Sequence, residues 1–265
     1  VVGGGSGAQT YSDAVTLGAN TSLTASTVSF NSTLDSAPTT TKTLAIVGNV
    51  QFGDATGSDS VGAIDKLASL SVSGTTGVAK SATGINTTGD QTYTGAVTLQ
   101  DGNAATTYTL DSSVSGKLWF KSTVDGSNAG KATLVANTAG VTQFDAAVGT
   151  TSLAALSTSA AGSTQINGGT VTTSVVGGGS GAQTYSDAVT LGPNTTLTGS
   201  TVTFDNTVNA ATAGAQSLVV AGDTVFNNTV GATTKLGALS VSGNSYLNGG
   251  VVTTLGPQTY SGDVI

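Results

Sequence analysis

The chain has no cysteine, histidine, methionine, glutamate or arginine, and each absence excludes some chemistry. Without cysteine there is neither a disulfide nor a thiol nucleophile. Without histidine there is no Ser-His or Cys-His pair and no ordinary zinc site. Because glutamate is also missing, only pairs of aspartates remain as acid and base. We therefore expect no enzymatic activity, no catalytic residue and no cofactor.

Charge is scarce as well. Charged residues make up 8% of the sequence, against roughly 25% in ordinary soluble domains. The fourteen acidic residues are all aspartate, the seven basic residues are all lysine, and the net charge is −7. Scattered lysines do not form the clustered positive surface that nucleic acids and anionic membranes require. No run approaches the roughly 18 apolar residues of a membrane-spanning helix. We expect no nucleic-acid partner and no membrane span in this segment.

Thr, Ser, Gly, Ala, Val and Asn fill the sequence instead. Thr and Val carry branched Cβ atoms that suit a pleated strand, whereas the residues that stabilise exposed helix faces are missing or rare. The composition therefore predicts an all-β protein.

Long repeats divide the chain into related units. The string VVGGGSGAQTYSDAVTLG occupies residues 1–18 and recurs without a substitution at residues 175–192. The tripeptide QTY begins at Gln9, Gln91, Gln183 and Gln258. We interpret residues 1–265 as a single continuous segment with sequence units at approximately 1–90, 91–174 and 175–257, and the start of a further unit at 258–265.

A shorter period lies within each unit. At nine places an aromatic residue is followed four positions later by Val or Leu, and successive aromatics within a unit lie 19, 22, 24 or 27 residues apart. The residues around them alternate between apolar and polar, as in a half-buried strand. A sub-repeat of about 20 residues cannot bury its own hydrophobic face, so it must stack on copies of itself.

The sequence thus predicts a β-solenoid of about 20–25-residue coils, with about twelve coils in a rod of about 60 Å. We expect the aromatic residues to form an inward core ladder of Tyr11, Phe30, Phe52, Tyr93, Phe120, Phe144, Tyr185, Phe204, Phe226 and Tyr260. The rival fold is a string of β-sandwich domains, which requires linkers between units and no repetition inside them.

Three strings carry a family resemblance: QTYSDAVTLG at 183–192, NTTLTGSTVTF at 194–204 and LSVSGNSYLNGGVVTT at 239–254. They resemble the repeat regions of filamentous-haemagglutinin-like bacterial adhesins and related giant β-strand-repeat surface proteins. The resemblance implies a right-handed parallel β-helix that is secreted to the bacterial cell surface and serves adhesion, aggregation or biofilm cohesion. The repeats of that family bring no catalytic residues with them.

These observations support a leading function and two alternatives. The leading hypothesis is a structural shaft segment of a large secreted bacterial surface adhesin, whose partners are neighbouring repeats of the same long chain. The first alternative is a subunit that pairs with other copies of itself to form an extracellular filament or sheath. The second is a module that binds host or matrix glycans or proteins through the insertion around Trp119, with Lys117 and Lys121 beside it. Against that, Trp119 would simply pack under the insertion.

Five aspartates are the remaining candidates for chemistry. Asp54, Asp59 and Asp65 follow Phe52 in a polar segment, but calcium needs several converging oxygens, and we expect solvated loop carboxylates and no metal there. Asp13 and Asp187 occupy equivalent positions after QTYS, where the other units carry glycine. We expect both to be turn residues.

Overall fold

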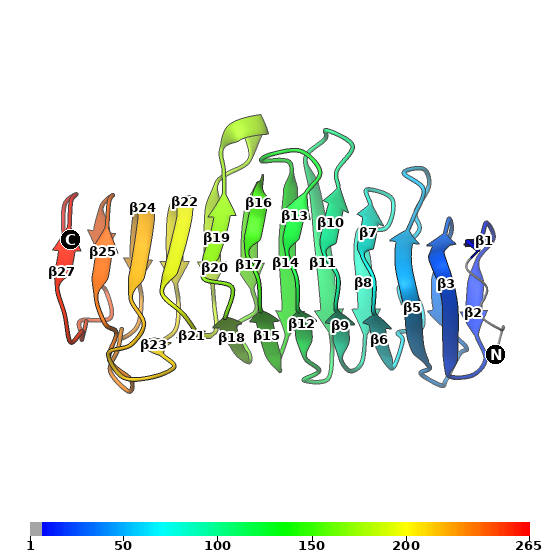
Figure 1. Cartoon of the computed structure of the whole chain (residues 1–265), viewed down its shortest axis with the longest axis horizontal. Coiled ribbons are helices and arrows are strands. Elements are labelled where there is room, and N and C mark those ends of the chain that lie inside the picture. The colour runs from blue at the N-terminus through cyan, green and yellow to red at the C-terminus, as the bar shows by residue number, and fades with distance from the viewer. Residues whose placement is uncertain (1–6) are drawn as a thin grey trace.

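Parallel strand pairing runs through the part of the chain that the computed structural model describes, residues 7–265. The strands wind into a β-solenoid of about 11 turns with about 23 residues per turn, close to the twelve coils expected. Figure 1 shows the strands side by side along one elongated body, with the N-terminus and the C-terminus at opposite ends. The predicted β-solenoid is confirmed, and the rival string of β-sandwich domains is wrong, because the pairing continues from unit to unit.

Each strand pairs with the strand one coil away, so that the pairing divides into three ladders. Ladder A contains β1 (Gln9–Tyr11), β7 (Thr76–Ala79), β10 (Val97–Gln100), β13 (Val124–Gly126), β16 (Val148–Leu153), β19 (Thr170–Thr173), β25 (Leu239–Val241) and β27 (Gln258–Tyr260). Ladder B contains β6 (Ser69–Val72), β9 (Gln91–Tyr93), β12 (Leu118–Phe120), β15 (Val141–Phe144), β18 (Ser163–Ile166), β21 (Ala188–Leu191) and β23 (Val208–Ala210).

Ladder C contains β2 (Val15–Leu17), β4 (Leu34–Ser36), β8 (Gly84–Thr87), β11 (Thr106–Ser112), β14 (Ala132–Thr138), β17 (Ala155–Thr158), β20 (Ala182–Tyr185) and β26 (Ser245–Tyr246). Four long strands each contribute one half to one ladder and the other half to the next: β3 (Thr21–Phe30), β5 (Thr43–Phe52), β22 (Thr195–Phe204) and β24 (Leu218–Phe226). The one helical element within residues 7–265 is the short 3-10 turn η1 (Val176–Gly178).

The long strands turn a corner of the coil without a loop because they contain glycine at the bend. Gly48 in β5 has a φ of +134° and Gly222 in β24 has a φ of +149°, values that residues with a side chain rarely adopt. A Cβ atom on Gly222 would also lie 2.0 Å from the backbone oxygen of Gly199 in the adjoining coil. Close stacking of consecutive corners therefore requires glycine at this position.

The four-residue spacing in the sequence follows from the corner geometry. Tyr11 is the last residue of β1 and Val15 is the first residue of β2, and Tyr93 and Val97 end β9 and begin β10 in the same way. The three residues between them make the corner. The aromatic residue and the apolar residue thus point into the same interior from two adjacent ladders.

Successive QTY strands lie on different ladders. Gln9 is on ladder A, Gln91 on ladder B, Gln183 on ladder C, and Gln258 on ladder A again. Each lies eleven strand segments after the one before, when the halves of the long strands and the isolated bridges are counted as segments. Since three segments complete one coil, each sequence unit spans three and two-thirds coils, although its length in residues varies.

Candidate functional site

The QTY signature forms a buried hydrogen-bonded cluster. Gln183 and Tyr185 both point inward from β20 and are 0% exposed. The Tyr185 hydroxyl donates to Gln183 Oε1 at 2.9 Å. Gln183 Nε2 donates to the backbone oxygen of Thr198 at 2.9 Å and to that of Val171 at 3.2 Å. These two carbonyls belong to consecutive coils, so the glutamine joins one coil to the next.

The same cluster recurs on another ladder at β9. The Tyr93 hydroxyl donates to Gln91 Oε1 at 2.8 Å, and Gln91 Nε2 donates to the backbone oxygens of Ile85 at 3.0 Å and Asp111 at 2.9 Å. Burial raises the pKa of Tyr93 and holds it in the neutral, hydrogen-donating form. The sequence marks the motif by its repetition but does not show that the glutamine side chain is buried, because polar residues are rarely found inside.

The residues of the expected core ladder lie in three separate stacks rather than in one column. Ring centroids are 5.1 to 5.9 Å apart and the planes are nearly parallel. The stacks are Tyr11, Phe30 and Phe52 on ladder A, Tyr93, Phe120 and Phe144 on ladder B, and Tyr185, Phe204 and Phe226 on ladder C. Within this list Tyr11 is half-buried and the other eight residues are buried, while Tyr260 is half-buried on ladder A.

Trp119 points outward from ladder B between two lysines. Leu118 and Phe120 on either side of it are buried, whereas Trp119 is half-buried. The ammonium groups of Lys117 and Lys121 lie 3.8 Å and 3.9 Å from the centre of the indole ring. Such contacts between a cation and an aromatic face are attractive. The three side chains therefore form one preorganised outward cluster.

Asp145 in the next coil fixes the indole from one side. Its carboxylate accepts hydrogen bonds from Trp119 Nε1, from Gln143 Nε2 and, at 2.8 Å, from Asn167 Nδ2. Burial acts to raise the pKa of Asp145, but the hydrogen bonds from Asn167, Gln143 and Trp119 outweigh it, with help from the charge of Lys117, and the pKa lies below its ordinary value. Asp145 is thus ionised at neutral pH.

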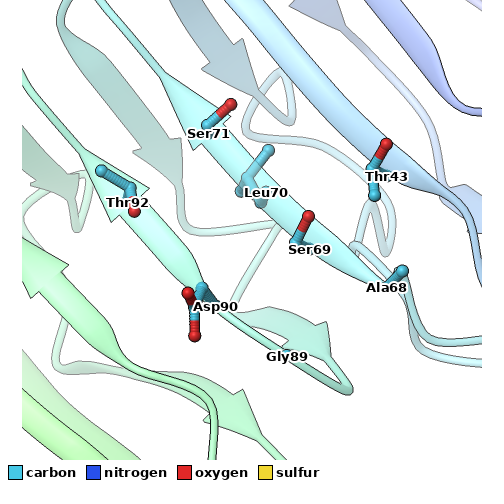
Figure 2. Close-up of a pocket in the computed structure, with 8 residues that line it drawn as sticks. All are labelled: Thr43, Ala68, Ser69, Leu70, Ser71, Gly89, Asp90 and Thr92. Carbon is cyan, nitrogen blue, oxygen red and sulfur yellow. The ribbon is translucent and has the colours of Figure 1, made fainter.

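A shallow depression of about 520 Å³ lies on ladder B beside this cluster. Figure 2 shows the hydroxyl groups of Thr43, Ser69 and Ser71 around it, with Asp90 at one end. Thr92, which also lines the depression, is the pairing partner of Trp119 in the adjacent strand. The outward face of ladder B therefore combines a surface rich in hydroxyl groups with one anchored aromatic ring.

The aspartates after Phe52 do not converge on a common point. Asp54 is exposed and accepts hydrogen bonds from Thr56, which lower its pKa. Asp59 is buried and its carboxylate accepts the backbone N–H of Asp54 at 3.3 Å, so the expectation of a solvated carboxylate is wrong for Asp59. Among residues 7–265 no group of three or more acidic or histidine side chains is placed to hold a metal ion.

The two equivalent aspartates after QTYS have different environments. Asp13 is exposed, as expected of a turn residue. Asp187 is 1% exposed, and its Oδ1 accepts hydrogen bonds from the hydroxyls of Thr158 at 2.9 Å and Thr164 at 2.7 Å. The expectation that Asp187 is a simple surface turn residue is therefore wrong. No signal in the surrounding sequence could have shown this, because the two strings are identical.

Comparison with protein-family models, with curated proteins and with solved structures finds no match to this chain. Within residues 7–265 no helix has the length and hydrophobicity to cross a bilayer. The function must therefore be argued from the architecture and the surface alone.

Proposed function

We propose that this chain is a structural shaft segment of a large secreted bacterial surface adhesin and that it catalyses no reaction. The observation that carries the proposal is the unbroken parallel pairing through about 11 turns. At about 4.8 Å per coil this pairing makes a rod of about 50 Å. In such a stack each coil contacts only its neighbours, so local contacts provide both length and stiffness. The resemblance of the repeats to adhesin repeat regions supports the bacterial cell surface as the location.

The interior supports a mechanical role. Stacked aromatic rings and the buried glutamines both connect one coil to the next, in addition to the backbone ladders. A shaft under tension along its axis loads many of these contacts at once. The polar groups with the most hydrogen bonds in this interior, Gln91 and Gln183, hold coils together and leave no reactive group free at the surface.

The shaft proposal is tested by labelling and by electron microscopy. An antibody raised against the purified segment should label the outer surface of intact cells of the source organism, and labelling confined to permeabilised cells would contradict the proposal. Electron microscopy of the segment should show uniform short rods at all concentrations. Fibres that grow as the concentration is raised would instead support the alternative, an extracellular filament built from copies of the chain.

One observation favours glycan binding as a second role. The anchored indole of Trp119 lies next to a depression lined by hydroxyl groups, and aromatic rings beside polar groups are common in sugar sites. On a glycan array the Trp119→Ala variant should lose the signal of the unmodified segment. The matched control is Tyr246→Ala, which removes another half-buried aromatic, on ladder C. Binding that survives Trp119→Ala would refute this role.

A further inference from the structure

Asp187 presents an unusual chemical situation inside the solenoid. One oxygen of its carboxyl group, Oδ1, accepts the two threonine hydroxyl groups described above, while the other, Oδ2, is buried and has no hydrogen-bond partner. A buried carboxylate oxygen without a partner carries a high desolvation cost when it is charged. The neutral acid avoids this cost.

The two threonines bracket one corner of the preceding coil. Thr158 is the last residue of β17, Thr164 lies in β18, and residues 159–162 form the turn between them. Asp187 belongs to the next coil, between β20 and β21. A single carboxyl group therefore fastens both ends of this turn to the adjoining coil.

No positive charge faces Asp187 from the elements packed around it. Strands β14, β15, β17, β18 and β20 to β23, together with the turns that join β17 to β18, β20 to β21 and β22 to β23, contain no lysine, and their titratable side chains besides Asp187 are Tyr185 and Asp205. Tyr185 is neutral and donates its proton to Gln183. Asp205 carries the same sign of charge as an ionised Asp187, and its carboxylate already accepts hydrogen bonds from Ser186 at 3.2 Å and Asn227 at 2.8 Å.

We propose that Asp187 acts as a proton-operated latch, in which the neutral acid fastens the turn at residues 159–162 to the next coil and loss of the proton releases it. The released state exposes the carboxylate to water and frees both threonine hydroxyls. The proton is thus the only cation that the latch requires. This control of one corner of the coil goes beyond the shaft function and does not depend on it.

The pH dependence follows from the direction of the pKa shift. Burial raises the pKa of Asp187 in the closed state, against the lowering effect of Thr164 and Thr158. In the open state the carboxyl group has its ordinary pKa. Below that ordinary value both states are protonated and pH has no effect. Between the two values opening releases one proton, so the opening constant rises about tenfold per pH unit. Above the raised value the dependence ends, because both states are ionised.

The chain supplies its own matched control. Asp13 follows the same QTYS string, yet it is exposed. Asp187→Asn keeps the shape of the side chain and removes the titration, whereas Asp13→Asn makes the same chemical change where no latch exists.

Hydrogen exchange tests the proposal in the full segment. After correction for the intrinsic pH dependence of exchange, peptides covering residues 158–164 should open about tenfold more per pH unit above about pH 4 until the raised pKa is reached. In Asp187→Asn this rise should be absent, and Asp13→Asn should behave as the unmodified chain does. A flat profile in the unmodified chain, or a rise that persists in Asp187→Asn, would overturn the latch.

A second measurement does not depend on how well the variant folds. In carbon NMR of the unmodified segment labelled at the aspartate carboxyl carbons, one of the fourteen resonances should titrate well above the others. That resonance should be missing from Asp187→Asn and present in Asp13→Asn. A spectrum in which all fourteen carboxyl groups titrate in the ordinary range would refute the proposal.

Discussion

Replacement of Gln183 with alanine tests whether the QTY cluster stabilises the coil. The change removes the donors to the backbone oxygens of Thr198 and Val171 and leaves the buried hydroxyl of Tyr185 without its acceptor. Each lost hydrogen bond costs about 0.5 to 1.5 kcal/mol and an unsatisfied buried group costs about 1 to 3 kcal/mol. We expect the free energy of unfolding to fall by about 3 to 5 kcal/mol.

Gln9 provides the comparison because it stands in the identical 18-residue string. It is half-buried, and its Nε2 donates to a single backbone oxygen, that of Thr24, at 3.1 Å. The partner Tyr11 is also half-buried, so water can replace the missing acceptor. Gln9→Ala should therefore cost about 1 kcal/mol.

Urea denaturation followed by circular dichroism measures both variants. A double variant with Tyr185→Phe adds a check, since removal of the hydroxyl group relieves the buried unsatisfied donor. Gln183→Ala combined with Tyr185→Phe should be less destabilised than the sum of the two single changes. Equal effects of Gln183→Ala and Gln9→Ala, or simple additivity in the double variant, would refute the reasoning.

Three further changes are predicted from the geometry. Gly222→Ala should lower the free energy of unfolding by more than about 3 kcal/mol, because it combines an unfavourable φ with a backbone collision, while Gly250→Ala, with a φ of +68° and open space around it, should cost about 1 to 2 kcal/mol in the same urea titration. Phe204→Leu loses stacked rings on both sides and should cost about 1 to 3 kcal/mol in thermal unfolding. Trp119→Phe removes one hydrogen bond to Asp145, and the pKa of Asp145 should rise towards its ordinary value in a carbon NMR titration. An unchanged pKa there, or equal costs for the two glycine changes, would contradict these arguments.

The solenoid could be predicted because its corners have a fixed length. An aromatic residue ends one segment and an apolar residue begins the next, as at Tyr93 and Val97, so the spacing of four recurs whatever the length of the other turns. The assignment of each aromatic to a ladder could not be predicted. The 27 residues between Tyr93 and Phe120 contain one coil, as do the 19 residues between Tyr185 and Phe204, and only the pairing shows that both are single turns.

The burial of a polar side chain could be predicted even less well. Asp13 and Asp187 have the same neighbours in sequence, but their environments are set by the adjoining coil. At Asp187 the preceding coil makes a turn at residues 159–162 with a threonine at each end, and these hydroxyl groups attract the carboxyl group inward. Contacts between coils are long-range in sequence, so a local pattern does not contain them.

The constant number of segments per unit bears on the choice between a shaft and a laterally packed sheath. Each unit spans eleven segments and thus begins one ladder further around the axis, so that equivalent strands return to ladder A only after three units, at β27. A flat sheet of parallel rods would need equivalent side chains on one face in every unit. In this chain they wind around the axis instead, with QTY on ladders A, B and C in turn. Side chains arranged on a screw distribute contacts around a rod, which favours the shaft over the sheath.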